Sequence, residues 1–192
     1  MNNKFEHHNT RVTDHIPLCV DLDGTLVKND LLFTSMVLLF KRSLVSLFVF
    51  PFWVLLGRAR LKDIIANRIA VDPSTLRFNT EILAYLHNEK NKGRTILLVS
   101  GSHISIAKSV ADYLQIFSEV IASNKNVNLT GTTKAKVLVK KFGEGHFDYI
   151  GNSYVDIPVW LKSRKALIVS NSVRLIRRLQ KVKPVEVIFA SH

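Results

Sequence analysis

The chain has 192 residues, of which 47% are hydrophobic and 22% charged, so it can form one domain with a modest insertion and is not globally disordered. Its single cysteine, Cys19, excludes a disulfide framework and a cysteine-based zinc site, and it favours a reducing compartment. The formal net charge of +12 favours anionic partners, but it does not choose among nucleic acid, acidic lipid and phosphorylated substrates.

The predicted elements alternate between strands and helices along most of the chain. Residues 1–13 are polar, lack the apolar stretch of a signal peptide and are predicted to form a short arm. Strand-like apolar runs follow at residues 17–22, 95–99, 119–122, 147–150, 166–169 and 185–189. Helical patterns occupy residues 80–91, 104–114, 134–142, 154–161 and 173–180. Short continuous apolar strands alternating with helices predict a doubly wound α/β fold with a parallel sheet.

Residues 30–79 interrupt this alternation, because they carry only helix-like patterns. We predict a core domain over residues 14–29 and 80–192, with residues 30–79 as a strongly apolar helical insertion. Lys41, Arg42 and Pro51 divide its most apolar part, and the charge-free residues 43–57 are fewer than the roughly 20 that cross a bilayer. A spanning helix is therefore disfavoured, whereas a helix that dips into a membrane stays open.

Polar residues collect at the carboxyl ends of the predicted strands, where open α/β sheets bind ligands. Asp21 and Asp23 end the first strand, and their spacing on an extended segment places both carboxylates on one side. The same edge is expected to hold Ser100, Lys134, Asn152 and Asp156. Carboxylate and amide oxygens suit Mg²⁺, and a hydroxyl with an ammonium suits a phosphate. The sequence therefore predicts a site for a divalent cation and a phosphate.

These residues resemble the motifs of the haloacid-dehalogenase-like (HAD) phosphohydrolases. Asp21-Leu22-Asp23-Gly24-Thr25 is similar to motif I, Ser100 to motif II and Lys134 to motif III, with Lys136 as a local alternative for motif III. Gly151-Asn152-Ser153 with Asp156 is similar to the acidic motif IV. The order and spacing agree over roughly residues 17–173, and the insertion corresponds to the helical C1 cap of the family.

The resemblance implies a phosphatase that uses Mg²⁺ and a two-step phosphoryl transfer. In that scheme Asp21 is the nucleophile that forms an aspartyl-phosphate, and Asp23 is the general acid and base. The implied phosphate contacts are Gly24, Thr25, Ser100, Gly101 and Lys134. The implied Mg²⁺ ligands are the Asp21 carboxylate, the Asp23 backbone carbonyl, Asn152 and, through water, Asp156. Asn152 replaces the commoner Asp, so weaker Mg²⁺ binding is expected.

A narrower resemblance concerns residues 128–160, which are similar to the HAD domain fused to UbiA-type membrane prenyltransferases. The similar runs are Asn128-Leu129-Thr130-Gly131, Lys134-Ala135, Phe142-Gly143, residues 147–153 and residues 156–160. In that family the membrane half follows the phosphatase half, so we expect it to be absent from a chain that stops at His192. The resemblance implies a prenyltransferase as a partner.

We expect a phosphomonoester hydrolase of the cytoplasm or of the cytoplasmic membrane surface, acting on a phosphorylated small molecule, a sugar phosphate or a lipid-linked phosphate. Cations on both sides of the apolar stretch suit an anionic membrane surface. The alternatives are an inactive phosphate-binding module, a phosphotransferase of the same fold and a cap that binds a protein partner. Nucleic acid is not expected, because the basic residues are spread along the chain without interleaved exposed aromatic residues.

Overall fold

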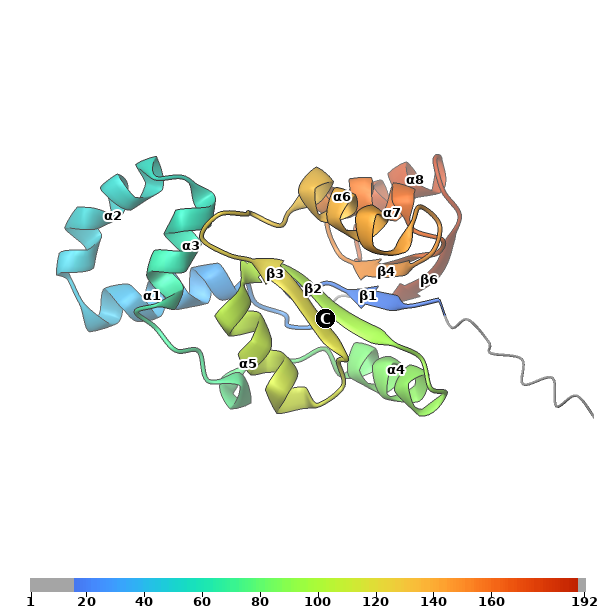
Figure 1. The fold of residues 1–192 in the computed structure, drawn as a ribbon, viewed down its shortest axis with the longest axis horizontal. Coiled ribbons are helices and arrows are strands. Elements are labelled where there is room, and N and C mark those ends of the chain that lie inside the picture. The colour runs from blue at the N-terminus through green and yellow to red at the C-terminus, as the bar shows by residue number, and fades with distance from the viewer. Residues whose placement is uncertain (1–15, 190–192) are drawn as a thin grey trace, which may run out of the picture.

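A computed structural model describes residues 16–189 as six parallel strands with helices on both faces of the sheet (Figure 1). The predicted arm, residues 1–13, lies outside the described residues. The strand order is β3-β2-β1-β4-β5-β6, and every neighbouring pair is parallel. The doubly wound α/β fold is therefore confirmed. The strands are β1 (Leu18–Val20), β2 (Ile96–His103), β3 (Glu119–Ser123), β4 (Asp148–Gly151), β5 (Ala166–Val169) and β6 (Val185–Phe189).

Five helices of the core cover the two faces of this sheet. On one face lie α4 (Thr80–Asn91) and α5 (Ile104–Leu114), and on the other lie α6 (Gly131–Phe142), α7 (Ile157–Lys162) and α8 (Val173–Gln180). The helix predicted over residues 154–161 is instead a short 3₁₀ turn, η2 (Tyr154–Asp156), followed by α7. The turn forms because the Asp156 side chain folds back to cap it.

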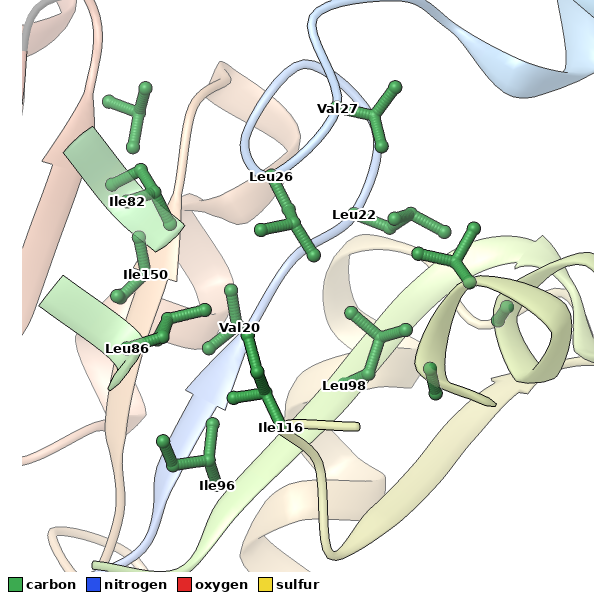
Figure 2. Close-up of a cluster of buried hydrophobic side chains, with 14 of the residues drawn as sticks. Val20, Leu22, Leu26, Val27, Ile82, Leu86, Ile96, Leu98, Ile116 and Ile150 are labelled. Atoms are coloured by element: carbon green, nitrogen blue, oxygen red, sulfur yellow. The ribbon is translucent and has the colours of Figure 1, made fainter. Parts of the chain in front are cut away.

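The short strand β1 is buried on both faces, which explains why all its residues are apolar. Successive strand residues point to opposite faces, so Leu18 and Val20 pack under α4 and α5 while Cys19 packs under α6 and α7. Figure 2 shows Val20 together with Leu86 of α4 and Ile96 of β2. This central strand carries the first site residues at its carboxyl end.

After β1 the chain leaves the core to form three helices, α1 (Leu31–Arg42), α2 (Val45–Leu55) and α3 (Arg58–Ala66), which we call the cap. Figure 1 places the cap at one end of the molecule, with α2 farthest from the sheet. A small cluster holds the three helices together: Leu39, Leu61, Ile65 and Ile69, with Phe50 and Trp53 partly buried against it. In the described part of the chain, every helix is too short or too polar to cross a membrane.

The chain returns to the core beside the point where it left. Val27 and Phe78 form an antiparallel bridge, and the Asn79 backbone N–H donates to the Leu26 carbonyl at 2.9 Å. Val71 is buried among core residues, and the 3₁₀ turn η1 (Pro73–Thr75) contacts α5. The last part of the segment predicted as an insertion therefore lies on the core, whereas α1 to α3 project from it.

Candidate active site

A pocket of about 430 Å³ lies between the cap and the carboxyl ends of β1, β2 and β4. Its walls combine the polar residues that end the strands with residues from the start of α1 and from α3. The lining residues are Asp21, Asp23, Gly24, Lys28, Asp30, Leu32, Lys62, Gly101, Ser102, Thr130, Lys134, Asn152, Ser153, Val155 and Asp156.

Asp21 follows β1 directly and is anchored to the neighbouring strand, because its backbone N–H donates to the Ile150 carbonyl at 3.0 Å. One oxygen of its buried carboxylate accepts a hydrogen bond from Lys134 Nζ at 2.6 Å. The other accepts one from Thr25 Oγ1 at 3.3 Å. Burial raises the pKa of Asp21 to about 7, although the nearby Lys134 ammonium acts in the opposite direction.

Asp23 connects three parts of the molecule at the pocket wall. Its Oδ1 accepts a hydrogen bond from the backbone N–H of Leu31, the first residue of α1, at 2.9 Å. Its Oδ2 accepts from Ser102 Oγ at 2.7 Å and from Ser100 Oγ at 3.3 Å. Burial raises the pKa of Asp23, and the hydrogen bonds that it accepts counteract this only in part. These hydrogen bonds hold the Asp23 carboxyl group in place at the pocket wall.

Gly24 is required where the chain turns between these carboxylates and the cap. Its φ of +72° is rarely adopted by residues with a side chain. A Cβ at this position would also lie only 2.1 Å from Asn152 Nδ2. The turn therefore lets the loop after β1 approach the Asn152 amide, which follows β4, closely enough for both to line one pocket.

Lys134 enters the pocket from the first turn of α6 and is buried there, whereas Lys136 is exposed outside the pocket. Besides Asp21, Lys134 Nζ donates to Tyr149 Oη at 2.8 Å, and Tyr149 Oη donates to Asp156 Oδ1 at 2.7 Å. Burial alone would lower the pKa of Lys134, but the surrounding carboxylates outweigh it and the pKa is raised. Lys134 therefore remains an ammonium ion inside the pocket.

The Asp156 carboxylate is saturated by donors of the protein. Its Oδ2 accepts hydrogen bonds from the backbone N–H groups of Asn152 and Ser153, both at 3.1 Å, and from Ser153 Oγ at 3.2 Å. With Tyr149 on Oδ1, four donors surround this buried side chain. Asp156 thus orders the loop that carries Asn152, and its predicted action on a metal through water stays a prediction.

The structure places a second serine, Ser102, beside the predicted motif II serine. Ser100 is fully buried behind the pocket wall, and its Oγ accepts a hydrogen bond from the Ser102 backbone N–H at 2.9 Å. Ser102 itself lines the pocket. Sequence reasoning missed it because strand β2 was expected to end at Val99, whereas it continues to His103. Two residues apart on an extended strand, both hydroxyl groups reach Asp23.

Two other predicted phosphate contacts differ in their surroundings. Thr25 is buried behind Asp21 and does not line the pocket, so in this structure it supports the Asp21 carboxylate. Gly101 does line the pocket, and a Cβ there would come within 2.8 Å of Thr130 Cγ2. Gly101 therefore lets the loop before α6 approach β2.

The cap contributes charged residues that no local motif indicates. Lys62 of α3 donates from Nζ to the Gly101 carbonyl at 2.5 Å and to Asn128 Oδ1 at 2.7 Å. Burial lowers the pKa of Lys62, and the carboxylates of Asp23 and Asp30 oppose this. Next to it, Asp63 Oδ1 lies 3.2 Å from His103 Nε2. These contacts attach α3 to the end of β2 and place a cation at the pocket.

The donor chemistry at the pocket fits a hard divalent cation. Asp21 and Asp156 are buried and face the Lys134 ammonium at 2.6 Å and 3.6 Å, and the half-buried Asp23 lines the same pocket. The excess negative charge in a buried site would be offset by a cation. Within residues 16–189 no three His, Cys, Asp or Glu side chains are grouped to hold a metal. The predicted ligands are a different set, because they include a backbone carbonyl and an amide.

The chain is similar to a curated protein that is itself uncharacterized. No family model matches the chain. It is 32% identical over 166 residues to the uncharacterized protein y4nM of Sinorhizobium fredii, an alignment that covers 86% of this chain and 32% of that protein. The chain thus spans about a third of the length of this relative.

Similar solved structures define the fold class. The chain is similar to a HAD family hydrolase of Salmonella enterica serovar Typhi, with a TM-score of 0.62, 12% identity, and coverage of 92% of this chain and 69% of that one. It is also similar to the 3-deoxy-D-manno-octulosonate 8-phosphate phosphatase of Moraxella catarrhalis, solved with magnesium and phosphate ions. The TM-score is 0.50 with 17% identity, and 91% and 76% of the two chains are covered. The chain therefore has the fold of the HAD-family hydrolases.

Proposed function

We propose that this chain is a Mg²⁺-dependent phosphomonoester hydrolase that works through an aspartyl-phosphate on Asp21. The observation that carries the proposal is the 2.6 Å contact between Lys134 Nζ and the buried Asp21 carboxylate, at the carboxyl end of the central strand. Asp23 lines the same pocket two residues further on. The likeness in fold to phosphatases adds support.

In the first step the Asp21 carboxylate attacks phosphorus, and the bond between phosphorus and the ester oxygen breaks. The leaving oxygen takes a proton from Asp23, which the Leu31 N–H and the Ser102 hydroxyl hold at the pocket wall. In the second step water attacks the phosphorus of the aspartyl-phosphate while the Asp23 carboxylate accepts its proton. Inorganic phosphate leaves, and Asp21 is regenerated.

The negative charge that develops on the phosphoryl oxygens needs fixed positive groups, which usually supply the largest part of such catalysis. Lys134 provides an ammonium ion, and we assign further phosphate contacts to Gly101 and Ser102, which line the pocket. Ser100, predicted as a phosphate contact, is buried behind them and accepts the Ser102 N–H, so we assign it the positioning of Ser102. Mg²⁺, when bound, would offset charge on the phosphoryl oxygens. Its ligands would be the Asp21 carboxylate, the Asp23 carbonyl and Asn152, with Asp156 acting through water.

The test is the hydrolysis of a generic aryl phosphate with Mg²⁺ by the wild type and by Asp21→Asn. We expect the variant to lose turnover while its thermal unfolding stays unchanged, and Asp23→Asn to lose roughly 10²- to 10⁴-fold. Asp112→Asn, a change at an exposed carboxylate of α5, is the matched control and should keep full activity. An Asp21→Asn protein with a tenth of the wild-type rate would refute the assignment. Fluoroberyllate, a phosphate mimic, should bind the wild type and not this variant.

We assign the substrate to phosphorylated small molecules, with sugar phosphates and lipid-linked phosphates as the classes to test first, at the cytoplasmic face of a membrane. Leu32 and Lys62 bring an apolar and a cationic side chain of the cap to the pocket. This pair suits a substrate that has an apolar part and an anionic part. A screen across both classes decides between them. Association with a prenyltransferase rests on the sequence resemblance alone, and a pull-down with such an enzyme tests it.

A second candidate is a phosphate-binding module with little or no turnover. Two observations favour it: motif IV carries Asn152, and the four donors on Asp156 leave that carboxylate little capacity for a metal. Calorimetric binding of inorganic phosphate without hydrolysis of any phosphate ester would select this candidate. Transfer of the phosphoryl group to an added alcohol in place of water would indicate a phosphotransferase.

A further inference from the structure

Helix α2 and its flanking residues expose a continuous apolar surface. We call the exposed apolar side chains of residues 44–56 the cap face. Its most exposed members are Phe48 at 79%, Leu55 at 83%, Leu44 at 71%, Val45 at 68% and Phe52 at 67%. Isolated exposed apolar residues are normal on proteins, but a contiguous patch of them marks an interaction site.

The cap face is not the packing side of the cap. The residues of α2 that contact α1 and α3 are others, chiefly Phe50 and Trp53, which lie against the cluster around Leu61 and Ile65. Helix α2 is thus apolar on the side that packs and on the side that faces outward. A helix of a water-exposed cap needs only one apolar side, so the outward side requires a separate explanation.

Positive charge surrounds the cap face, and negative charge is absent from it. Lys41 and Arg42 end α1, Arg58 and Arg60 begin α3, and all four side chains are exposed. Residues 31–62 contain no aspartate or glutamate. An apolar centre with cations on both sides is complementary to the surface of an anionic bilayer, where apolar groups enter the acyl boundary and cations stay at the headgroups.

We propose that the cap face docks the protein on an anionic lipid bilayer, with α2 lying in the plane of the interface. The 11 residues of α2 make a helix of about 16 Å, far less than the roughly 30 Å of a hydrocarbon core. Figure 1 shows α2 at the end of the molecule away from the sheet, so docking leaves the core domain in water.

A second hollow lies along α1, next to the candidate active site. About 400 Å³ in volume, it runs along α1 between Asp30 and the apolar side chains of Phe33, Val37 and Leu38. Asp30 also lines the active-site pocket. Resting on the proposed function, we infer that the substrate is a phosphomonoester carried by a lipid, because this apolar hollow shares Asp30 with the pocket that holds Asp21.

Flotation with vesicles tests the docking surface. The wild type should float with equimolar phosphatidylcholine and phosphatidylglycerol, whereas Phe48→Ser/Phe52→Ser/Leu55→Ser should remain at the bottom, its partition coefficient reduced by about a hundredfold or more. Phe50 and Trp53 are left intact because they hold the cap together. The matched control, Tyr113→Ser/Leu161→Ser/Val173→Ser, removes three exposed apolar residues from the core and should float like the wild type.

Removing charge gives an independent measurement on a correctly folded cap. Each cation near an anionic surface changes the partition coefficient by about fivefold. Lys41→Gln/Arg42→Gln should therefore lower binding to the anionic vesicles by about 25-fold, without changing binding to vesicles of phosphatidylcholine alone. High salt should reduce the difference between the two lipids.

Several outcomes would overturn the proposal. In the first, the wild type stays in the soluble fraction with anionic vesicles. In the second, the wild type and the cap-face variant float equally. In the third, the wild type is oligomeric and the cap-face variant monomeric, and neither binds vesicles. Failure of the phosphatase assignment is distinguishable, because it would abolish hydrolysis of the soluble aryl phosphate by all these proteins while flotation is unaffected. If both assignments hold, the cap-face variant hydrolyses the soluble substrate at the wild-type rate.

Discussion

The core and the cap each contain a strongly apolar segment, but the segment of the core is buried and that of the cap is exposed. Strand β1 is apolar because helices cover both of its faces, and its polar neighbours Asp21 and Asp23 begin where that cover ends. Helix α2 is apolar over almost its whole length, yet most of its side chains are exposed. Hydropathy alone therefore does not distinguish a core element from an interaction surface, whereas the layers that surround each element do.

The largest difference between the two regions should appear in the free energy of unfolding when a leucine of the core and a leucine of the cap are each replaced by alanine. Leu86 of α4 is fully buried, and Leu86→Ala should lower the free energy of unfolding by about 2–5 kcal/mol. Leu55 of α2 is 83% exposed, so Leu55→Ala should change it by less than about 0.5 kcal/mol. Chemical denaturation measures both values. If both variants lost the same free energy of unfolding, the cap face would be packed in solution. The difference between a buried core and an exposed cap face would then not hold.

Substitutions of the two pocket lysines, Lys134 and Lys62, should separate an effect on kcat from an effect on KM. Lys134, from the core, contacts the Asp21 carboxylate, so Lys134→Met should lower kcat about 10²- to 10³-fold. Lys136→Met, two residues away on the exposed side of α6, is the control and should behave like the wild type. Steady-state kinetics on an aryl phosphate decides, and a normal kcat for Lys134→Met would remove Lys134 from the mechanism.

Lys62, from the cap, should act on binding rather than on turnover. Its Nζ has two neutral acceptors, Gly101 O and Asn128 Oδ1, and it lines the pocket with a charge that an anionic substrate can use. Lys62→Met should raise KM about tenfold with kcat nearly unchanged. Arg60→Met, at an exposed cation of the same helix, supplies the control. A fall in kcat at constant KM would instead place Lys62 in the chemical step.

The smallest effect is expected at Cys19, in the middle of β1. Burial raises the pKa of its thiol to about 12. Because only the thiolate reacts with aromatic disulfide reagents, the native protein should show no reaction at pH 8, whereas the unfolded chain should release one equivalent of product. Reaction of the native protein at the unfolded rate would show that β1 opens readily and is not the rigid base of the site.

Local patterns were sufficient to predict where the six strands lie, although β2 continues four residues beyond its predicted end at Val99. An apolar run followed by Asp21 and Asp23 identifies both the strand and its pocket-lining end, since the sheet brings all carboxyl ends to one edge. The choice between Lys134 and Lys136 needed the helix register. Helix α6 begins at Gly131, which turns Lys134, Ala135 and Leu138 inward and leaves Lys136 exposed.

Contacts between distant segments could not be predicted in this way. Lys62 reaches Gly101 across 39 positions of the chain, and no pattern within the cap marks it. The role of Tyr149 between Lys134 and Asp156 also depends on which helix covers β4. In α2 the periodicity fails because apolar residues occupy both sides, so the sequence did not distinguish the packed Phe50 from the exposed Phe48.

The bridge between Val27 and Phe78 has a consequence for how proteins of this fold diversify. The chain leaves and re-enters the core at adjacent points, with Asn79 bonded to Leu26. A segment whose two ends already meet can be lengthened, shortened or exchanged without altering the sheet, because each doubling of its length costs only about 0.6 kcal/mol in closure entropy. The insertion is thus an interchangeable module, and the wall that it gives the pocket can change while Asp21, Asp23 and Lys134 keep their positions.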